Sequence, residues 1–519
     1  MLPFDHRLTG DPGHGRSRMT RRLLLLLVAC LLACTCVSGQ KKVSVTEVSV
    51  DSAVEDIQWG GADHSVVFLK TTKGRLYRST DSGKQWNDIT NSLVLSETEP
   101  GAPATAITVD SMLLNPVDKN IVLVVGTKHS HFISNDAGRT WRRLKQRVPI
   151  HSWQFHPTQP HWALLSAWSD QCHTASEPAK TAAGGAATDK ACNHMLYVTK
   201  DLGVQFHLVS SYVVQFSWGD VKHNQQNWIY FTHHRTKEGG QPKYGGWTKN
   251  VDFAVTEDFG RSHRVLMHHG NKFLVSNGYT FVAKSEDEAK QTVALMVSTD
   301  GGKTFEKAKL PFELSEKSYT VLDTSEGAVM LHVNHGDEGR SGSGNVYISD
   351  HKGLRYSLSL PSNVRTTTGE TEFDRVLSLE GVYLANFKDD PEAEGALSAA
   401  AVEKKTEDKA AEQQEEEVSQ TAVDSRHKPK RRSKAEDVVK TVISFDKGAV
   451  WSYLRAPKID STGNKIECPP DRCWLHLHGV TNFHNYAPFY SVENSVGIIM
   501  GTGNVGPHLR YEADEVNTY

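Results

Sequence analysis

The stretch Ser298–Phe305 reads Ser-Thr-Asp-Gly-Gly-Lys-Thr-Phe, and Ser134–Trp141 repeats the phrase as Ser-Asn-Asp-Ala-Gly-Arg-Thr-Trp. Both match the pattern Ser/Thr-x-Asp-x-Gly-x-Thr-Trp/Phe, which is known as an Asp box. Looser copies begin at five further positions: Ser79, Thr199, Thr256, Ser349 and Ser444. A phrase that recurs along a chain sets its architecture, so the repeat is the first feature to interpret.

Each copy has the chemistry of a tight turn between two strands. The Asp carboxylate can accept hydrogen bonds from nearby backbone N–H groups, and the glycine two residues later can adopt a positive φ. An apolar, strand-like run precedes most copies, and the closing Trp or Phe anchors the next strand. We therefore assign a structural role in the fold, and no catalytic role, to these residues: Asp81, Asp136, Asp201, Asp258, Asp300, Asp350, Asp446, Trp86, Trp141, Phe206, Phe305 and Trp451.

The spacing of the copies predicts the fold class. The Asp residues of most neighbouring copies lie about 40 to 65 residues apart, which is the length of a propeller blade of four short strands. Only the last interval, from Asp350 to Asp446, is nearly twice as long as the others. One Asp box would indicate no more than a surface turn. Seven in series predict an all-β fold, an Asp-box β-propeller that occupies residues 43–519.

Residues 389–437 account for the long interval. They are rich in Ala, Glu, Lys and Gln and contain no Phe, Tyr or Trp, so they cannot build a packed core. We interpret them as a low-complexity charged insert within the propeller. The basic run Lys430-Arg431-Arg432 leaves two further interpretations open, a processing site for a secretory convertase and an address signal.

The N-terminus has the features of a secretory signal peptide. Arg21 and Arg22 precede the apolar run Leu23–Cys34, and small residues follow up to Gly39. We assign residues 1–39 to an N-terminal extension and signal peptide, and expect the rest of the chain in the lumen of the secretory pathway. The chain is 38% hydrophobic and 23% charged with a net charge of −3, which is typical of a globular protein and argues against nucleic-acid binding.

Four cysteines follow the signal peptide, an even number for an oxidising compartment. Cys172 and Cys192 flank a loop rich in Ala and Gly, while Cys468 and Cys473 flank a short Pro-containing turn. Pairing by proximity is the expectation, although four cysteines allow three connectivities. A zinc site with nearby histidines is the alternative. Such sites usually show two close pairs of ligands, so we expect no metal.

Six phrases in the second half of the chain occur together in one known family. They are Tyr347–Leu360, Thr366–Asp374, Leu379–Tyr383, Ile443–Trp451, Cys468–His478 and Asn494–Gly506. In order and spacing they resemble the Vps10 domain of the sortilin family, and the resemblance covers roughly residues 50–510. It implies a ten-bladed β-propeller, of which about eight blades' worth is present. It also implies a sorting receptor that binds protein or peptide cargo in or around a wide central tunnel.

The resemblance also implies how the domain is used. Such receptors sort proteins between the Golgi, endosomes and the vacuole, lysosome or cell surface, and in them a cysteine-rich module, a membrane span and a cytosolic tail follow the propeller. We interpret this chain as the luminal part of such a type I membrane protein, truncated at its C-terminus. Sortilin-like receptors that grip a peptide carboxylate use an Arg in the strand before the box that begins here at Ser298. The matching positions are Val293 and Ala294, so that grip is not expected.

Two alternatives to a sorting receptor are an enzyme and a secreted propeller scaffold without a sorting role. Asp boxes also occur in sialidases and other propeller glycosidases, which need central carboxylates or a Tyr–Glu pair, and arginines that hold the substrate. The sequence has no Arg-Ile-Pro phrase before its first box, and no nucleophile-elbow, metalloprotease or phosphate-loop motif. We predict no enzyme and no cofactor. Ligand-contact residues stay unassigned, because a propeller's binding surface is assembled from loops of many blades.

Histidine suggests a mechanism for cargo release. The chain has 25 histidines, with groups at His129/His131, His233/His234, His268/His269 and His476/His478/His484. Cargo must be released in acidified endosomes, and histidine is the side chain that gains charge between pH 8 and pH 5. If several of them lie at the cargo face, protonation would repel basic cargo or repack an interface. If they are scattered surface and turn residues, no such effect is expected.

Overall fold

The structure is a computed structural model. It describes residues 47–93, 107–127, 130–144, 150–169, 172, 192–237, 240–241, 249–315, 318–334, 342–366, 369–389, 438–460, 463–466, 468–469, 473–479, 489–493 and 495–510. The predicted signal peptide and residues 390–437 of the predicted insert lie outside the described residues. The chain divides into two units, Met1–Val50 and Asp51–Tyr519, and every element below belongs to the second unit.

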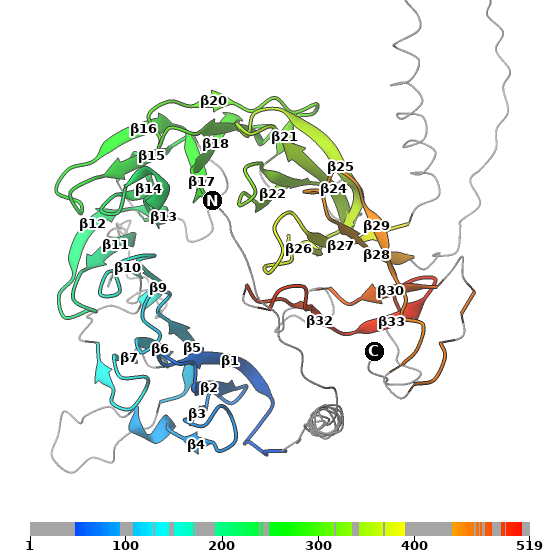
Figure 1. Cartoon of the computed structure of the whole chain (residues 1–519). Helices are drawn as coiled ribbons and strands as arrows, with labels where there is room; N and C mark the ends of the chain where they lie inside the picture. The colour runs from blue at the N-terminus through cyan, green and yellow to red at the C-terminus, as the bar shows by residue number, and fades with distance from the viewer. Residues whose placement is uncertain are drawn as a thin grey trace, which may run out of the picture. The chain divides into compact units, whose positions relative to one another are not determined.

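Antiparallel sheets of four strands follow one another along the second unit (Figure 1), and we call each such sheet a blade. Blades 1 to 3 have the strands β1 (Val54–Gly60), β2 (Val66–Thr71), β3 (Leu76–Ser79), β4 (Asn87–Asp88); β5 (Val109–Leu114), β6 (Val122–Gly126), β7 (Ser130–Ser134), β8 (Arg142–Arg143); β9 (Ile150–Phe155), β10 (Ala163–Trp168), β11 (His194–Thr199) and β12 (His207–Ser211). Blades 4 and 5 have β13 (Val213–Trp218), β14 (Ile229–His234), β15 (Val251–Thr256), β16 (Arg264–His268); β17 (Gly270–Ser276), β18 (Tyr279–Asp287), β19 (Thr292–Ser298) and β20 (Glu306–Lys307), with β21 (Leu314–Ser315) added to β19.

Blades 6 and 7 repeat the four-strand order within one larger sheet, joined by the single pair Asn363–Phe387. Their strands are β22 (Tyr319–Asp323), β23 (Met330–Val333), β24 (Ser343–Ser349), β25 (Tyr356–Val364); β26 (Phe373–Arg375), β27 (Tyr383–Lys388), β28 (Val439–Ser444) and β29 (Ser452–Arg455). The sheet continues through β30 (Trp474–Leu477) and β33 (Gly503–Gly506), while β31 (Phe489–Tyr490) pairs with β32 (Met500–Gly501). The described residues contain no α-helix; their 3₁₀ turns include η1 (Thr90–Ser92) and η4 (Val221–His223).

Neighbouring blades pack face to face. Along β6, Val122 and Val124 contact blade 1, whereas Leu123 between them contacts blade 3, because successive side chains of a strand point to opposite faces. Both faces of the sheet are therefore buried, which explains why this strand reads as a continuous apolar run. Such apolar clusters join each of the seven blades to the next, and full burial of one Val or Leu contributes roughly 1.5–3 kcal/mol. This succession of packed blades confirms the predicted β-propeller class. The blade number stays a prediction.

The Asp boxes form the turn between the third and fourth strand of each blade. At Asp136, Oδ1 accepts hydrogen bonds from the backbone nitrogens of Arg139 (3.0 Å) and Thr140 (2.8 Å) and from the hydroxyl of Ser134 (2.8 Å). The Ser134 hydroxyl in turn accepts from the Gly138 nitrogen at 2.8 Å. Most of the other copies repeat this arrangement. The exception is the box at Ser349, where Asp350 follows the serine directly and its carboxylate accepts from the nitrogens of Lys352 and Leu354.

The residue after the aspartate has a positive φ in most copies, as at Ala137 (φ 54°) and Leu202 (φ 56°). This left-handed conformation turns the carbonyl of the residue toward the preceding blade, where a side chain donates to it. Arg78 Nε donates to the Ala137 oxygen at 2.7 Å, and Arg142 Nη2 donates to the Leu202 oxygen at 2.5 Å. In blade 5, Tyr230 Oη donates to the oxygen of Gly301 at 3.0 Å. The boxes therefore join neighbouring blades as well as turning the chain.

The box glycine lies against the preceding blade. A Cβ atom on Gly138 (φ 73°) would come within 2.6 Å of the Phe68 ring in blade 1. In blade 4, a Cβ on Gly260 would come within 2.6 Å of Val209 Cα in blade 3. Gly83 of blade 1 shares the positive φ (89°), but a Cβ there would meet only its own Trp86, at 3.6 Å. Beyond the turn conformation, these glycines allow close approach of the blades.

We expect Gly138→Ala to destabilise the protein more than Gly83→Ala. Both substitutions place a side chain at positive φ, which costs about 1 kcal/mol. Only the first also forces a methyl group into Phe68, and overpacking adds roughly 1–3 kcal/mol. Guanidinium unfolding of the two variants and the parent measures the difference. Equal losses of stability would contradict a packing role for the box glycine between blades.

Candidate functional site

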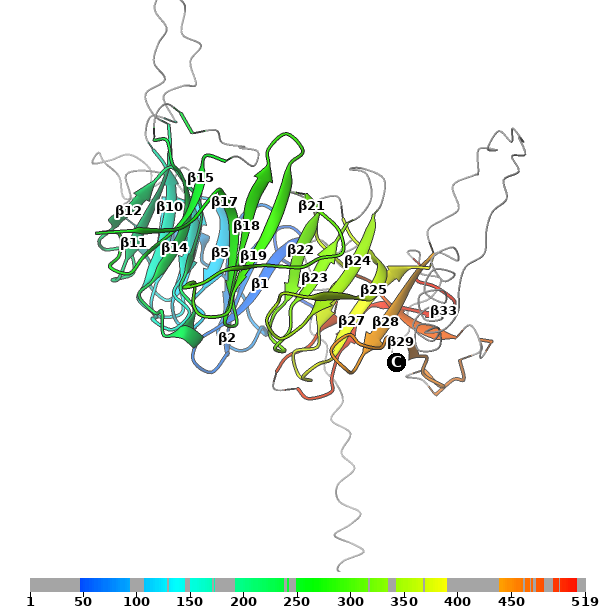
Figure 2. The same cartoon turned by 90° about the horizontal axis from the view of Figure 1, so that it is seen from above.

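The two ends of the blades differ in their connections. In an antiparallel blade, the turns between strands 1 and 2 and between strands 3 and 4 share one end, and the remaining connections share the other. The Asp boxes all lie at the first end, which we call the Asp-box end. The long connections, such as β10 to β11, β14 to β15 and β27 to β28, leave from the opposite end. Figure 2 shows the strands of neighbouring blades side by side between these ends.

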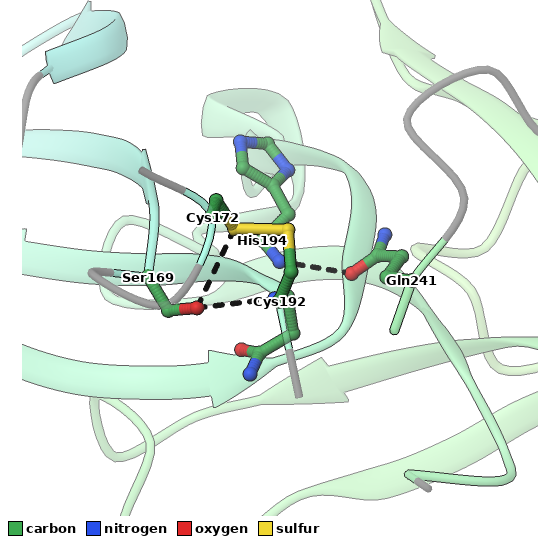
Figure 3. Close-up of a disulfide and its surroundings, with 6 residues drawn as sticks. Ser169, Cys172, Cys192, His194 and Gln241 are labelled. Carbon is green, nitrogen blue, oxygen red and sulfur yellow. Dashed lines mark hydrogen bonds between the residues drawn. A yellow bond between two sulfur atoms is a disulfide. The ribbon is translucent and has the colours of Figure 1, made fainter. Parts of the chain in front are cut away.

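One disulfide lies at the opposite end of blade 3. Cys172 pairs with Cys192, as expected from proximity (Figure 3). Gln241, from the connection between β14 and β15, contacts the chain next to the disulfide. Its backbone nitrogen donates to the Cys192 oxygen (2.7 Å), and its Oε1 accepts from the backbone nitrogen of His194 (2.9 Å). The Ser169 hydroxyl accepts from the Asn193 nitrogen at 3.1 Å. The disulfide therefore joins the two ends of the β10–β11 connection, and the hydrogen bonds of Gln241 attach the β14–β15 connection of blade 4 to it.

The second disulfide, Cys468–Cys473, precedes β30. In sequence it lies just before residues of a buried polar network, which links blade 7 to β30 and β33. Asn386 donates to Glu372 Oε2 (2.6 Å) and to the Leu477 oxygen (2.9 Å), and Thr441 Oγ1 accepts from the Leu477 nitrogen (2.9 Å). His476 continues it, with Nδ1 accepting from the Thr441 nitrogen and Nε2 contacting the Gly506 oxygen. Three of the six phrases that carry the family resemblance thus meet in one network, through Glu372, His476 with Leu477, and Gly506.

The first strand of each blade has one edge without a neighbouring strand, as for β5, β13, β17 and β22. Two of these edges are closed by glutamine side chains of the preceding blade. Gln215 Nε2 donates to the Phe273 oxygen on β17 (2.7 Å), and its Oε1 accepts from the Phe273 nitrogen (3.0 Å). Gln58 Nε2 donates to the Met112 oxygen on β5 (3.1 Å). These amides act as a substitute for an added strand.

The outer edge of β22 has no glutamine bonded to it among the described residues. The Asn334 nitrogen donates to the Ser318 oxygen (2.6 Å), so the backbone N–H and C=O groups of Ser318 point toward β23. Because these groups point alternately to the two sides of a strand, those of Tyr319 and Val321 point away from β23. Within the described residues, no hydrogen bond closes the outer edge at these two positions. All five side chains of β22 are half-buried. Sequence reasoning named no residue here. Gln58 and Gln215 are each followed by an aromatic residue, but Gln85 and Gln205 share that feature at Asp boxes, so the sequence alone does not mark the closed edges.

A cavity of about 590 Å³ lies in blade 5, beneath the chain that joins β20 to β21. Val293 and Ala294 line it and are both buried, and Leu310 and Phe312 form part of its wall. Of the two lysines in the lining, Lys307 pairs with Glu286 at 2.5 Å. Neither Val293 nor Ala294 can supply the positive charge that the family resemblance associates with these positions.

The grouped histidines have different environments. Burial lowers the pKa of His233 and of His476 to about 4, so both stay neutral at endosomal pH. Burial also lowers the pKa of His234 and of His478. His268 is exposed on β16, and His129 and His484 lie outside the described residues. At His233 and His476, therefore, mild acidification adds no charge.

The described part of the chain contains no group of three or more His, Cys, Asp or Glu side chains that could hold a metal ion. No helix in the same residues is long and apolar enough to cross a membrane.

We expect acidification to destabilise the fold through its buried histidines. Between pH 6.5 and pH 4 the unfolded chain takes up protons that His233 in the folded state does not, so stability falls as pH falls. His233→Leu should reduce the loss of unfolding free energy between pH 7 and pH 5 by about 1–2 kcal/mol. Urea unfolding at the two pH values measures it, with the exposed His207→Gln as control. An unchanged pH dependence in His233→Leu would exclude this assignment.

Comparisons with known proteins agree on one family. The Sortilin-Vps10 family model, described as "Sortilin, neurotensin receptor 3", matches residues 74–519. A protein of Ajellomyces capsulatus (strain H143) named vacuolar protein sorting/targeting protein 10 is 25% identical over 467 residues, which cover 86% of this chain and 28% of that protein. The protein of the same name from Mycosarcoma maydis is 24% identical, covering 98% of this chain and 31% of that protein. The chain spans less than a third of the length of these relatives.

Solved structures give looser matches. The β-propeller domain of the trilobed protease from Pyrococcus furiosus has a TM-score of 0.35 and 10% identity, covering 64% of this chain and 91% of that one. An ancestral GH74 enzyme has a TM-score of 0.31 and 12% identity, covering 66% and 39%. No functional argument follows from likenesses at this level. The family match rests on sequence, and it spans most of the chain: this protein belongs to the sortilin family of Vps10-domain proteins.

Proposed function

We propose that this chain is the luminal cargo-binding domain of a sorting receptor, and that it binds protein or peptide cargo without catalysis. The relatives are named for vacuolar protein sorting, which supports transport through the secretory pathway. Attachment to Golgi or endosome membranes would be supplied by parts of the longer receptor, as would movement between these compartments and the vacuole, lysosome or cell surface. The alternatives of a glycosidase and of a scaffold without a sorting role have no such support.

The outer edge of β22 is the observation that carries a binding mode. An extended peptide that lies beside Tyr319 and Val321 would find backbone donors and acceptors to which no described residue bonds, and would form a strand with main-chain hydrogen bonds. The half-buried side chains of β22 would supply contacts to alternate residues of the peptide. The edges of β5 and β17 offer less to a peptide, because Gln58 and Gln215 already bond to them.

The test uses one edge position with two substitutions. Val321→Pro removes the outward N–H group, and proline is tolerated at an outer edge because no ladder bond is lost. Val321→Ala shortens the side chain but keeps the N–H group. Octapeptides selected from a random phage-displayed library on the full chain are the probe, measured by fluorescence anisotropy.

We expect Val321→Pro to weaken binding of the selected peptides about tenfold, and Val321→Ala to weaken it less than threefold, because a lost hydrogen bond costs about 1 kcal/mol. Equal melting temperatures of both variants and the parent establish that the fold is retained. If the selection yields no peptide, the cargo-binding proposal fails. If selected peptides bind Val321→Pro as tightly as the parent, binding at the β22 edge fails.

A further inference from the structure

The turn between β22 and β23 lies at the Asp-box end of blade 6 and is held by both neighbouring blades. On the side of blade 5, Ser276 Oγ lies 2.8 Å from Thr324 Oγ1, and Asn277 Nδ2 donates to the same oxygen at 3.1 Å. On the side of blade 7, Tyr383 Oη donates to Asp323 Oδ2 at 2.6 Å. The C-terminal end of β22 is therefore attached to both of its neighbours.

Asp323 stabilises the turn itself as well as its contact with blade 7. Its Oδ1 accepts from the Ser325 nitrogen at 3.2 Å, and its Oδ2 accepts from the Ser325 hydroxyl at 2.8 Å. The Ser325 hydroxyl accepts in turn from Arg375 Nη1. A turn held by an aspartate side chain is thus connected to Arg375 and Tyr383, which end β26 and begin β27 respectively.

Glu326 adds ion pairs to the same contact. Its side chain is 7% exposed, and its carboxylate lies 3.7 Å from Arg375 Nη1 and 3.7 Å from Lys447 Nζ. Lys447 Nζ also donates to the backbone oxygen of Glu326 at 3.1 Å. A buried carboxylate is costly unless it is paired, so blade 7 supplies the cations that allow Glu326 to be buried in this turn. We call the following five residues the blade 6–7 link: Asp323, Glu326, Arg375, Tyr383 and Lys447.

The earlier blades are linked at the corresponding turns with fewer charges. From blade 1 to blade 5, the turn between the first two strands of each blade bonds to the same turn of the next blade. The bonds join Gly61 N to Lys119 O, Asn115 Nδ2 to Pro160 O, His156 Nε2 to Gln226 O, and Gly278 N to Asp220 Oδ2. One carboxylate takes part in these bonds, whereas the blade 6–7 link contains two carboxylates and two cations.

The strand β22 needs this support because its own ladder is irregular. The pairing with β23 shifts between Val321 and Asp323, so Leu322 is an extra residue on this strand. A bulge of this kind bends the strand and locally disrupts the hydrogen bonds of the ladder. Beyond the bulge, the side chain of Asp323 supplies further contacts that hold the strand. The blade 6–7 link therefore supports the backbone next to Val321, where the proposed peptide would bind.

Tyr383 is the member of the link that no ligand can reach. Its side chain is fully buried in the apolar cluster between blades 6 and 7. Burial and the bond with Asp323 raise the pKa of Tyr383, so the hydroxyl stays neutral and remains a donor. Any effect of Tyr383 on a ligand must therefore pass through the residues that it contacts.

We propose that the blade 6–7 link positions the β22 edge: it keeps the end of β22 extended, so that a peptide strand can add to it. This inference rests on the proposed cargo-binding function and deepens it, because it assigns part of the affinity to residues that the peptide does not contact. A peptide that adds to an edge already in place avoids the entropy cost of ordering that edge. When only a fraction of the molecules has the competent edge, the apparent dissociation constant rises in proportion.

The test compares two buried tyrosines that make the same kind of bond. Tyr383→Phe removes the hydroxyl that bonds to Asp323. The matched control, Tyr230→Phe, removes the hydroxyl of an equally buried tyrosine that donates to the Gly301 oxygen between blades 4 and 5. The probes are octapeptides selected on the full chain whose binding is weakened by Val321→Pro. Stopped-flow fluorescence measures their association and dissociation rates.

We expect Tyr383→Phe to lower the association rate about fivefold and to leave the dissociation rate within about twofold, because it reduces the population of the competent edge without removing a contact. Tyr230→Phe should change neither rate by more than about twofold. Lys447→Gln leaves Glu326 with one cation and should lower the association rate about threefold. The Lys447 side chain is 44% exposed, so this variant decides the question if Tyr383→Phe does not fold. Guanidinium unfolding establishes which variants are folded under the binding conditions.

Several results would overturn the proposal. Equal slowing of association by the two tyrosine variants would assign the effect to a general loss of stability. A change confined to the dissociation rate would indicate a lost contact and not a positioning role. If Val321→Pro weakens the selected peptides and Tyr383→Phe does not, this inference fails while binding at the β22 edge stands. If Val321→Pro weakens none of the selected peptides, the binding mode fails and this inference fails with it.

Discussion

The fold depends on one carboxylate in each repeated turn. By holding two backbone nitrogens and a hydroxyl, as Asp136 does, it keeps the following residue in a left-handed conformation that the chain would otherwise disfavour. The strained residue then presents its carbonyl to the preceding blade, where Arg78 donates to it. Hydrogen bonds of this kind also keep the box carboxylate ionised. In the box of blade 4, those from Ser262 and its neighbours lower the pKa of Asp258 to about 2. The conformation of the turn and the hydrogen bond between blades therefore both depend on the same carboxylate.

The repeat made the fold class predictable because its information is local. An Asp box specifies a turn within eight residues, and seven such turns leave few architectures open. The copy at Ser349 departs from the sequence pattern. Its aspartate follows the serine without the intervening residue, and the structure uses other backbone nitrogens in its place. The sequence likewise identified the box aromatic residues as anchors without indicating their contacts; Trp141, for example, packs against the apolar cluster shared by blades 1 and 2.

The candidate sites were less predictable because they depend on contacts between distant segments. Gln215 and Phe273 are far apart in sequence and meet because their blades are neighbours. Asp252 and Arg235 flank the β14–β15 connection and form an ion pair at 2.7 Å in which only the aspartate is buried, and neither residue type indicates this. Paired histidines gave the same signal at His233/His234 and at His268/His269, yet the blade buries the first pair in large part and leaves His268 in solvent. Burial, and not residue type, separates a structural histidine from one that can respond to pH.

The two-sided burial of each blade has a consequence for biosynthesis. A strand such as β6 can cover one of its faces only against the blade made before it, and the other face waits for the blade that follows. At a synthesis rate of about 5–20 residues per second, a further blade of about 50 residues takes roughly 3–10 s to emerge. Throughout synthesis, then, the growing end of the propeller carries an uncovered apolar sheet. Correct folding therefore requires that this face stay protected from other apolar surfaces until the next blade covers it.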